Sequence, residues 1–143
     1  MENGKSIDEI EIGESASFSK TISESDIYLF AGITGDFNPM HVNEEFAKDT
    51  PFKGRVAHGG IAMCLIAPVL GMKLPGMGTI ALSSFCRFRA PVFPGDTVTA
   101  TATVAEIDRV NNKVKMDCLW TKQGGVVVAD GESTVMPPAK EGD

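Results

Sequence analysis

The feature that most constrains the fold of this chain is a segment that is apolar on every side. Residues 59–74 carry the apolar side chains Ile61, Met63, Leu65, Ile66, Val69 and Leu70. A helix that is hydrophobic all round must be surrounded by the rest of its protein. The segment is too short and too rich in glycine to cross a bilayer, which needs about 20 apolar residues. We therefore predict a buried central helix, with a kink or an early break caused by Pro68, because proline lacks a backbone donor.

The second half of the chain changes to a period of two, which predicts strands with one buried face. The residues predicted to face inward in four successive strands are Ile80, Leu82, Ser84, Cys86 and Phe88; Val98, Ala100, Ala102 and Val104; Val114, Met116, Cys118 and Trp120; and Val127, Ala129, Gly131, Ser133 and Val135. The pairs Asn111-Asn112 and Gly124-Gly125 supply turns for an antiparallel sheet. Alanine and glycine among the inward positions leave room for a helix to lie against this sheet.

The first half predicts one more strand and two helices. Residues 16–22 form the strand, and Ser23 with Asp26 has the spacing of a capping box at the start of a helix of about three turns. This helix ends near Gly35, and Asn43 caps a short helix at 44–48. We expect one domain, residues 1–143, with loose ends at 1–9 and 137–143. Its class is α+β: a curved antiparallel sheet wrapped around a long hydrophobic central helix, the hot-dog architecture.

Composition excludes several classes of function. The formal net charge of −6 argues against nucleic-acid binding, which requires a basic face. The N-terminus lacks the basic start and apolar run of a secretory signal, and no segment could span a membrane. The cysteines Cys64, Cys86 and Cys118 form neither a disulfide framework nor a zinc motif, and we interpret them as small buried hydrophobic residues. These features predict a cytoplasmic protein without a membrane or nucleic-acid partner.

The most informative stretch for chemistry is residues 35–41, which read Gly-Asp-Phe-Asn-Pro-Met-His. The turn at Asn38 and Pro39, together with the freedom of Gly35, lets Asp36 and His41 point at a common spot. A carboxylate and an imidazole that share one spot can act as an acid/base pair near neutral pH. From spacing alone, it is equally reasonable that Asp36 caps a turn and that His41 is a partly buried surface histidine.

A second signal is the run His58-Gly59-Gly60, which opens the predicted central helix. Its first N–H groups lack partners and lie in the positive field of the helix start, so they could polarise a carbonyl. Glycine that merely permits tight helix entry explains the run at least as well. We interpret His58 as structural, bonding a backbone carbonyl that orders the loop. The spacing of the two histidines and Asp36 matches no known set of metal ligands, so no metal and no cofactor is predicted.

Taken together, these motifs resemble those of a known family. Residues 30–41 read Phe-Ala-Gly-Ile-Thr-Gly-Asp-Phe-Asn-Pro-Met-His, residues 56–59 read Val-Ala-His-Gly, and runs at 85–88 and 90–96 follow. This pattern resembles the (R)-specific enoyl-CoA hydratases of the MaoC-like dehydratase family. The likeness covers nearly the whole chain. One difference is Ala67, where some members carry a serine in the buried helix.

The resemblance implies a hot-dog homodimer that hydrates an enoyl-CoA to a (3R)-3-hydroxyacyl thioester, with its acyl-CoA tunnel near the dimer interface. At the matched positions, Asp36 and His41 would hold the water that attacks C3, and the Gly59 N–H would polarise the thioester carbonyl. We expect five residues to contribute to substrate binding: Asn38, Lys53, Arg55, Arg87 and Arg89. The four basic residues among them are expected to contact the CoA phosphates. Each basic residue could equally be a solvated surface charge.

Two alternative functions remain open from the sequence. A hot-dog acyl-CoA thioesterase typically places an acidic residue on the central helix, and residues 59–74 contain none. A non-catalytic acyl-binding module would need no acid/base pair. The sequence does not distinguish a CoA thioester from an acyl-carrier-protein thioester, and it does not set the acyl chain length.

Overall fold

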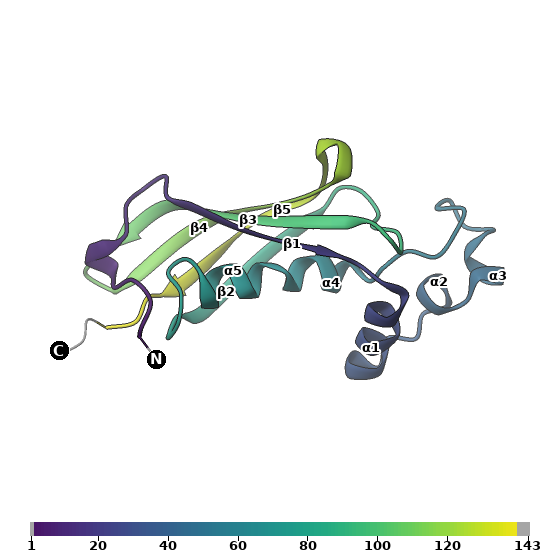
Figure 1. The fold of residues 1–143 in the computed structure, drawn as a ribbon, viewed down its shortest axis with the longest axis horizontal. Helices are drawn as coiled ribbons and strands as arrows, with labels where there is room; N and C mark the ends of the chain where they lie inside the picture. Colours follow the sequence, from purple (N-terminus) through teal and green to yellow (C-terminus); the bar gives the residue numbers. More distant parts are fainter. Residues whose placement is uncertain (1, 140–143) are drawn as a thin grey trace.

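A computed structural model describes residues 2–139, and its centre is one antiparallel sheet curved around a helical segment (Figure 1). The strand order is β1-β3-β4-β5-β2, with every neighbouring pair antiparallel. The strands are β1 (Ser15–Thr21), β2 (Ile80–Phe88), β3 (Thr97–Asp108), β4 (Lys113–Lys122) and β5 (Val126–Met136). The predicted hot-dog architecture is therefore confirmed.

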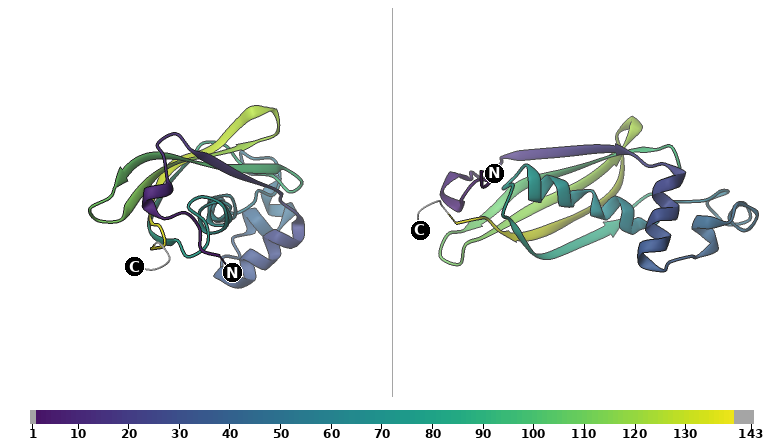
Figure 2. Two further views of the ribbon diagram at one scale, coloured as in Figure 1. Left: turned by 60° about the vertical axis from the view of Figure 1, so that its left-hand side comes forward. Right: turned by 60° about the horizontal axis from the view of Figure 1, so that its bottom comes forward.

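The core forms where the period-two pattern is strongest. The predicted inward residues of β3 and β4 are all buried: Val98, Ala100, Ala102, Val104, Val114, Met116, Cys118 and Trp120. The small alanines of β3 let a helix approach the sheet closely, and α5 (Ile66–Met72) packs against β3 and β1. In Figure 2 the helical segment of residues 59–72 runs along the concave side of the sheet.

One inward prediction in β5 is wrong because the strand contains an irregularity. The register shifts between the pairs Trp120–Ala129 and Thr121–Val127, so Val128 is the extra residue. Val128 is buried, whereas Val127 is exposed. A bulge of this kind inserts one residue and reverses the faces of those beyond it.

The central helix is broken, as Pro68 predicts. It consists of α4 (Gly59–Cys64) and α5 (Ile66–Met72), separated at Leu65. Pro68 has no N–H to offer the carbonyl of Cys64, which is the last residue of α4. The expectation of burial on every side is wrong for a single chain, because Cys64 and Ala67 are exposed.

Strand β2 departs from the predicted pattern in the same way. It is an edge strand, and four of its large apolar side chains are exposed: Ile80, Leu82, Phe85 and Phe88. A register shift between Ala81 and Ser83 also interrupts the alternation. The predicted inward face of β2 is thus not covered within one chain.

Three helices at one end of the sheet carry the loop that was predicted to be functional (Figure 1). Helix α1 (Glu24–Thr34) begins with the predicted capping box of Ser23 and Asp26 and ends at Gly35, whose φ is +78°. Helix α2 (Pro39–Val42) is one turn that the sequence did not predict, and α3 (Glu44–Ala47) is capped by Asn43 as expected. No helix among residues 2–139 is long and apolar enough to cross a membrane.

The predicted loose ends lie beside the opposite end of the sheet (Figure 1). Near the N-terminus, the amides of Gly4 and Lys5 donate to the carbonyls of Met77 and Pro75, and residues 7–9 form a turn of 3₁₀ helix. Residue 1 and residues 140–143, which belong to the segments predicted to be loose, lie outside the described residues. That these ends are loose stays a prediction.

Candidate active site

The loop between α1 and α2 is shaped by its own side chains. The backbone N–H of Asn38 donates to Asp36 Oδ1 at 3.1 Å, and the side-chain Oδ1 of Asn38 accepts from the backbone N–H of Met40 at 3.1 Å. Asn38 is therefore the N-cap of α2, with Pro39 in the first turn, where a missing N–H costs nothing. This capping turns His41 back toward Asp36. The Asn38 side chain, expected to contact substrate, is used within the loop.

Asp36 and His41 lie together as predicted. Asp36 Oδ2 and His41 Nε2 are 3.9 Å apart, too far for a direct hydrogen bond. This gap is shorter than two hydrogen bonds of about 2.8 Å each, so one water can touch both atoms. The Asp36 side chain is half exposed and the His41 side chain is 12% exposed. The site therefore presents two polar groups to one small volume.

The protonation of His41 follows from its second nitrogen. His41 Nδ1 lies 2.7 Å from the carbonyl oxygen of Val56. A carbonyl only accepts, so Nδ1 carries a proton, and in the neutral ring Nε2 keeps its lone pair. His41 thus meets the shared volume as an acceptor, beside the Asp36 carboxylate.

His58 lies directly behind this pair. Its ring stacks on the ring of His41, with centroids 3.9 Å apart and an interplanar angle of 29°, and the ring of Phe30 lies 4.9 Å away. His58 Nε2 is 2.9 Å from the carbonyl oxygen of Asp36. The interpretation of His58 as a residue that bonds a loop carbonyl is confirmed.

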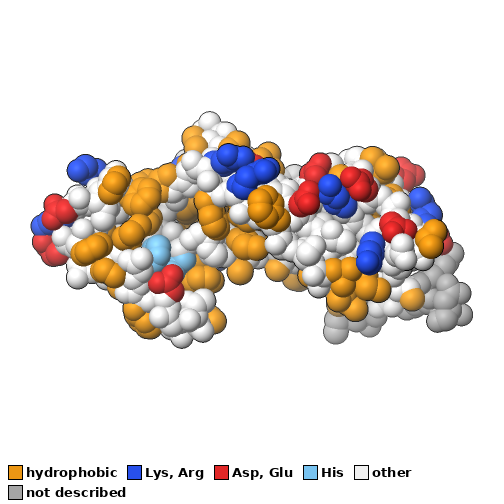
Figure 3. Space-filling view, turned by 180° about the vertical axis from the view of Figure 1, so that it is seen from behind, with side chains coloured by type: hydrophobic (Ala, Val, Ile, Leu, Met, Phe, Trp, Pro, Cys, Tyr) orange, Lys and Arg blue, Asp and Glu red, His pale blue; other side chains and the backbone are white. Residues whose placement is uncertain are grey.

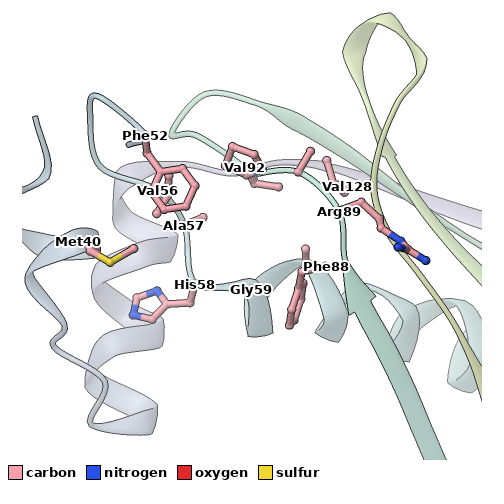
Figure 4. A pocket seen from close by; sticks show the side chains of 13 residues that line it. Met40, Phe52, Val56, Ala57, His58, Gly59, Phe88, Arg89, Val92 and Val128 are labelled. Atoms are coloured by element: carbon pink, nitrogen blue, oxygen red, sulfur yellow. The ribbon is translucent and has the colours of Figure 1, made fainter. Parts of the chain in front are cut away.

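Gly59 begins α4 at the wall of a cavity of about 390 Å³. The cavity wall is mostly apolar, and Figure 4 shows the side chains of Met40, Phe52, Val56, His58, Phe88, Arg89, Val92 and Val128 around it. A Cβ added at Gly59 would lie 2.8 Å from the Phe88 ring. Asp36 and His41 do not line this cavity themselves, but Met40, which precedes His41, and His58, which stacks on it, do. In Figure 3 the histidines border an acidic group and are flanked by hydrophobic side chains.

The four basic residues predicted to bind the CoA phosphates differ in their ion pairs within the protein. The Arg55 guanidinium is bound by the carboxylates of Glu24 and Glu44 and by the Tyr28 hydroxyl, so it ties α1 to α3. These contacts raise the pKa of Arg55, the hydrogen bond to Glu24 contributing most. Arg55 therefore has a structural task that the sequence did not reveal.

Arg87 and Arg89 share one carboxylate, and Arg89 also lines the cavity. Arg87 Nη2 lies 2.8 Å from Asp130 Oδ1, and Arg89 Nε lies 2.6 Å from Asp130 Oδ2. Two cations on one anion leave a net positive charge there. Lys53 is exposed on the loop before Gly59, and no ion pair is recorded for it within the described part of the chain.

Asp36, His41 and His58 could also be considered as metal ligands. One ligand atom from each of Asp36, His41 and His58 lies within 4.8 Å of the others. However, Nδ1 of His41 and Nε2 of His58 are taken by backbone carbonyls. Stacked rings also direct their remaining lone pairs within separate planes, whereas a metal needs ligands that converge. The geometry favours a bound water over a chelated cation.

Some contributors to the site were missed by sequence reasoning. The Val56 carbonyl sets the tautomer of His41, and no side-chain pattern could identify a backbone acceptor 15 residues away. Phe88, which contacts the position of a Gly59 side chain, lies in a run that carried the family resemblance but suggested no role.

Comparisons with known proteins agree with this geometry. The model of the MaoC-like domain matches residues 9–122. An (R)-specific enoyl-CoA hydratase of Rhodospirillum rubrum is 50% identical over 93% of this chain and 92% of its own. A 3-hydroxybutyryl-CoA dehydratase of Methylorubrum extorquens is 43% identical over 94% and 85%. The solved (R)-hydratase of Aeromonas caviae has a TM-score of 0.87 at 34% identity, covering 90% of this chain and 98% of its own.

Proposed function

The chain belongs to the MaoC-like domain family, and we propose that it hydrates trans-2-enoyl-CoA to (3R)-3-hydroxyacyl-CoA, reversibly. The observation that carries this proposal is the 3.9 Å gap between Asp36 Oδ2 and His41 Nε2 beside an apolar cavity. A hydratase needs a place for one activated water beside a place for an acyl thioester. The two relatives reported above are named for this reaction in its forward and reverse directions.

In the proposed mechanism, one water donates its two hydrogens to Asp36 Oδ2 and His41 Nε2. Both atoms are acceptors when Asp36 is a carboxylate and His41 is the neutral ring with its proton on Nδ1. The water oxygen then keeps its lone pairs for C3 of the enoyl thioester. As the C3–O bond forms, the C2=C3 π bond breaks, the pair takes a proton from the water, and the pair then delivers a proton to C2. Addition from one fixed side accounts for a single product configuration.

Gly59 would serve the other end of the conjugated system. Attack at C3 moves electron density onto the thioester oxygen, which becomes enolate-like. The Gly59 N–H is among the first of α4, where helix donors lack intrahelical partners. Directed at the thioester oxygen, it would stabilise this charge where it develops. The absence of a side chain at Gly59 lets the Phe88 ring pack against this helix start.

The direct test uses purified protein and trans-2-enoyl-CoAs of increasing chain length. We expect loss of the conjugated thioester absorbance without release of free CoA thiol, and a product of (3R) configuration. Thiol release would instead indicate the thioesterase, although α4 and α5 contain no acidic residue to support it. Binding without turnover would indicate the acyl-binding module. Parallel assays with acyl-carrier-protein thioesters decide between the two carriers.

We further propose a homodimer. Three apolar surfaces support it: the exposed side chains of β2, the exposed face of α4 and α5 at Cys64 and Ala67, and the exposed Leu29 and Ile33 of α1. An unpaired edge strand with large apolar side chains is a surface that proteins cover. We expect sedimentation to give twice the chain mass, and Phe85→Glu on β2 to shift the protein toward monomer. A wild-type monomer at working concentrations would contradict this.

We propose that Lys53, Arg87 and Arg89 hold the CoA phosphates. Arg89 lines the cavity, and the cluster of Arg87 and Arg89 keeps a net positive charge. Exposed ion pairs contribute about 0.2–1 kcal/mol each, so neutralising all three to Gln should raise KM roughly threefold or more. The effect should shrink as salt is added and be absent for pantetheine thioesters, which lack the nucleotide phosphates.

The matched control for this triple variant is Arg109→Gln, an exposed arginine in the turn after β3. It should change neither KM nor its salt dependence. Arg55→Gln should lower the melting temperature because it releases α1 from α3. A KM for CoA thioesters that ignores both salt and the triple substitution would refute the phosphate assignment.

A cytoplasmic location is also part of the proposal. Cys64, Cys86 and Cys118 are all free thiols, which suits a reducing compartment.

A further inference from the structure

His58 is a buried titratable residue that the proposed mechanism does not use. It is only 3% exposed, at the start of α4, and it makes one side-chain hydrogen bond, from Nε2 to the Asp36 carbonyl. Because that carbonyl can only accept, Nε2 carries a proton, and in the neutral ring it is the only one. Its Nδ1 is then a buried acceptor, and no partner for it exists among residues 2–139.

The two histidines therefore carry their protons on opposite nitrogens. His41 is protonated on Nδ1 by its bond to Val56, and His58 on Nε2 by its bond to Asp36. Two hydrogen bonds, each made by one of the stacked rings, therefore connect residues 36–41 with residues 56–58. Residues 56–58 provide a carbonyl for His41 and a ring for the backbone of Asp36. The catalytic loop is held against the helix start at both of its functional residues.

The unpaired Nδ1 argues against a role in stability alone. An unsatisfied buried polar atom costs free energy, and an apolar group of similar shape avoids that cost. Phe30 already packs on the His58 ring, so an aromatic replacement has a partner in place. What only the imidazole provides is the N–H that reaches the Asp36 carbonyl. Gly35, the residue before Asp36, has a φ of +78°. Because glycine has no side chain, this residue does not by itself restrict the loop to one conformation.

We infer that His58 is a positioning residue: its Nε2–H fixes the backbone of Asp36, and its ring supports His41, so that both groups reach one water. This inference rests on the proposed hydration. It assigns His58 no contact with the reacting atoms. A displacement of about 1 Å in a catalytic group can cost about 10²-fold in rate, which sets the scale of the expected effect.

Two substitutions separate the hydrogen bond from the ring. His58→Gln keeps an N–H that can reach the Asp36 carbonyl but removes the ring, and His58→Phe keeps the ring but removes the donor. We expect His58→Phe to lose roughly 10–100-fold in kcat, with KM nearly unchanged and a melting temperature within a few degrees of wild type. His58→Gln keeps the donor and should lose less kcat than His58→Phe, and its remaining loss measures the support that the ring gives to His41. A His58→Phe protein that folds and keeps its full kcat overturns the inference.

A double-mutant cycle tests whether His58 acts through Asp36. In an Asp36→Asn background there is no carboxylate to position, so His58→Phe should cost little more. If the two losses multiply, His58 acts elsewhere and the inference is wrong.

A second measurement does not depend on activity. The chain has two histidines, so the nitrogen chemical shifts of both rings can be assigned from the two single variants. We expect the Nδ1–H form for His41 and the Nε2–H form for His58. If the protein does not hydrate enoyl thioesters, the proposed function fails, and these shifts still report whether the two hydrogen bonds exist. Finding His58 in the Nδ1–H form overturns the positioning role whatever the reaction.

Discussion

Asp36→Asn is expected to lower kcat by roughly 10²–10⁴-fold, the usual contribution of a positioned acid or base. The amide keeps the shape of the side chain but cannot accept a proton from water. His41→Gln should cause a loss of the same order, because an amide cannot relay a proton. Both variants should keep KM nearly unchanged, since neither group is assigned to binding. Initial rates with a short trans-2-enoyl-CoA measure both effects.

The decisive measurement is the double variant. Asp36 Oδ2 and His41 Nε2 are 3.9 Å apart and are proposed to contact the same water. Removing either group should therefore disable the whole unit, and the double variant should be scarcely slower than the slower single variant. Two groups that act on separate steps would instead multiply their losses. Fully multiplicative losses, or a folded Asp36→Asn protein with near-normal kcat, would falsify the shared-water mechanism.

Gly59→Val is expected to lower kcat by about 10²–10³-fold, the cost of losing one donor to a developing oxyanion. The side chain would crowd the thioester oxygen away from the N–H at the start of α4. The structure supplies a competing cause, because a Cβ at this position would lie 2.8 Å from the Phe88 ring. A loss in the single variant alone does not separate these causes.

Relief of the Phe88 contact separates them. In a Phe88→Ala background the collision is gone, so a Gly59→Ala change that harms only packing should become harmless. If the side chain blocks the carbonyl, the loss should persist relative to Phe88→Ala alone. Gly71→Ala is the matched control, since a Cβ there meets nothing within 4 Å, and it should leave kcat unchanged. A Gly59→Ala/Phe88→Ala protein as active as Phe88→Ala alone would remove the oxyanion assignment.

The sequence by itself determined the elements whose causes are local. The capping box at Ser23, the stop at Gly35 and the break before Pro68 depend on neighbours within four residues, and all three occur as predicted. The alternation in β3 and β4 also sufficed, because these strands are paired on both sides and buried on one face. The proximity of Asp36 and His41 belongs here as well, since one capped turn connects them.

Only the tertiary structure decided which groups are available. Arg55 and Arg87 have the same chemistry in sequence, but Glu24 and Glu44 surround Arg55, whereas Arg87 stays exposed. The inward pattern of β2 did not determine its burial, because burial depends on what lies opposite, and within residues 2–139 its large apolar side chains stay exposed.

The state of the acid/base pair was decided in the same way. The bonds from His41 to Val56 and from His58 to Asp36 join residues 15 and 22 positions apart. Backbone carbonyls are present at every residue, so no sequence pattern marks the two that set these tautomers. Residue types and short-range spacing thus name the candidate groups, whereas long-range packing fixes their hydrogen-bond partners and their exposure.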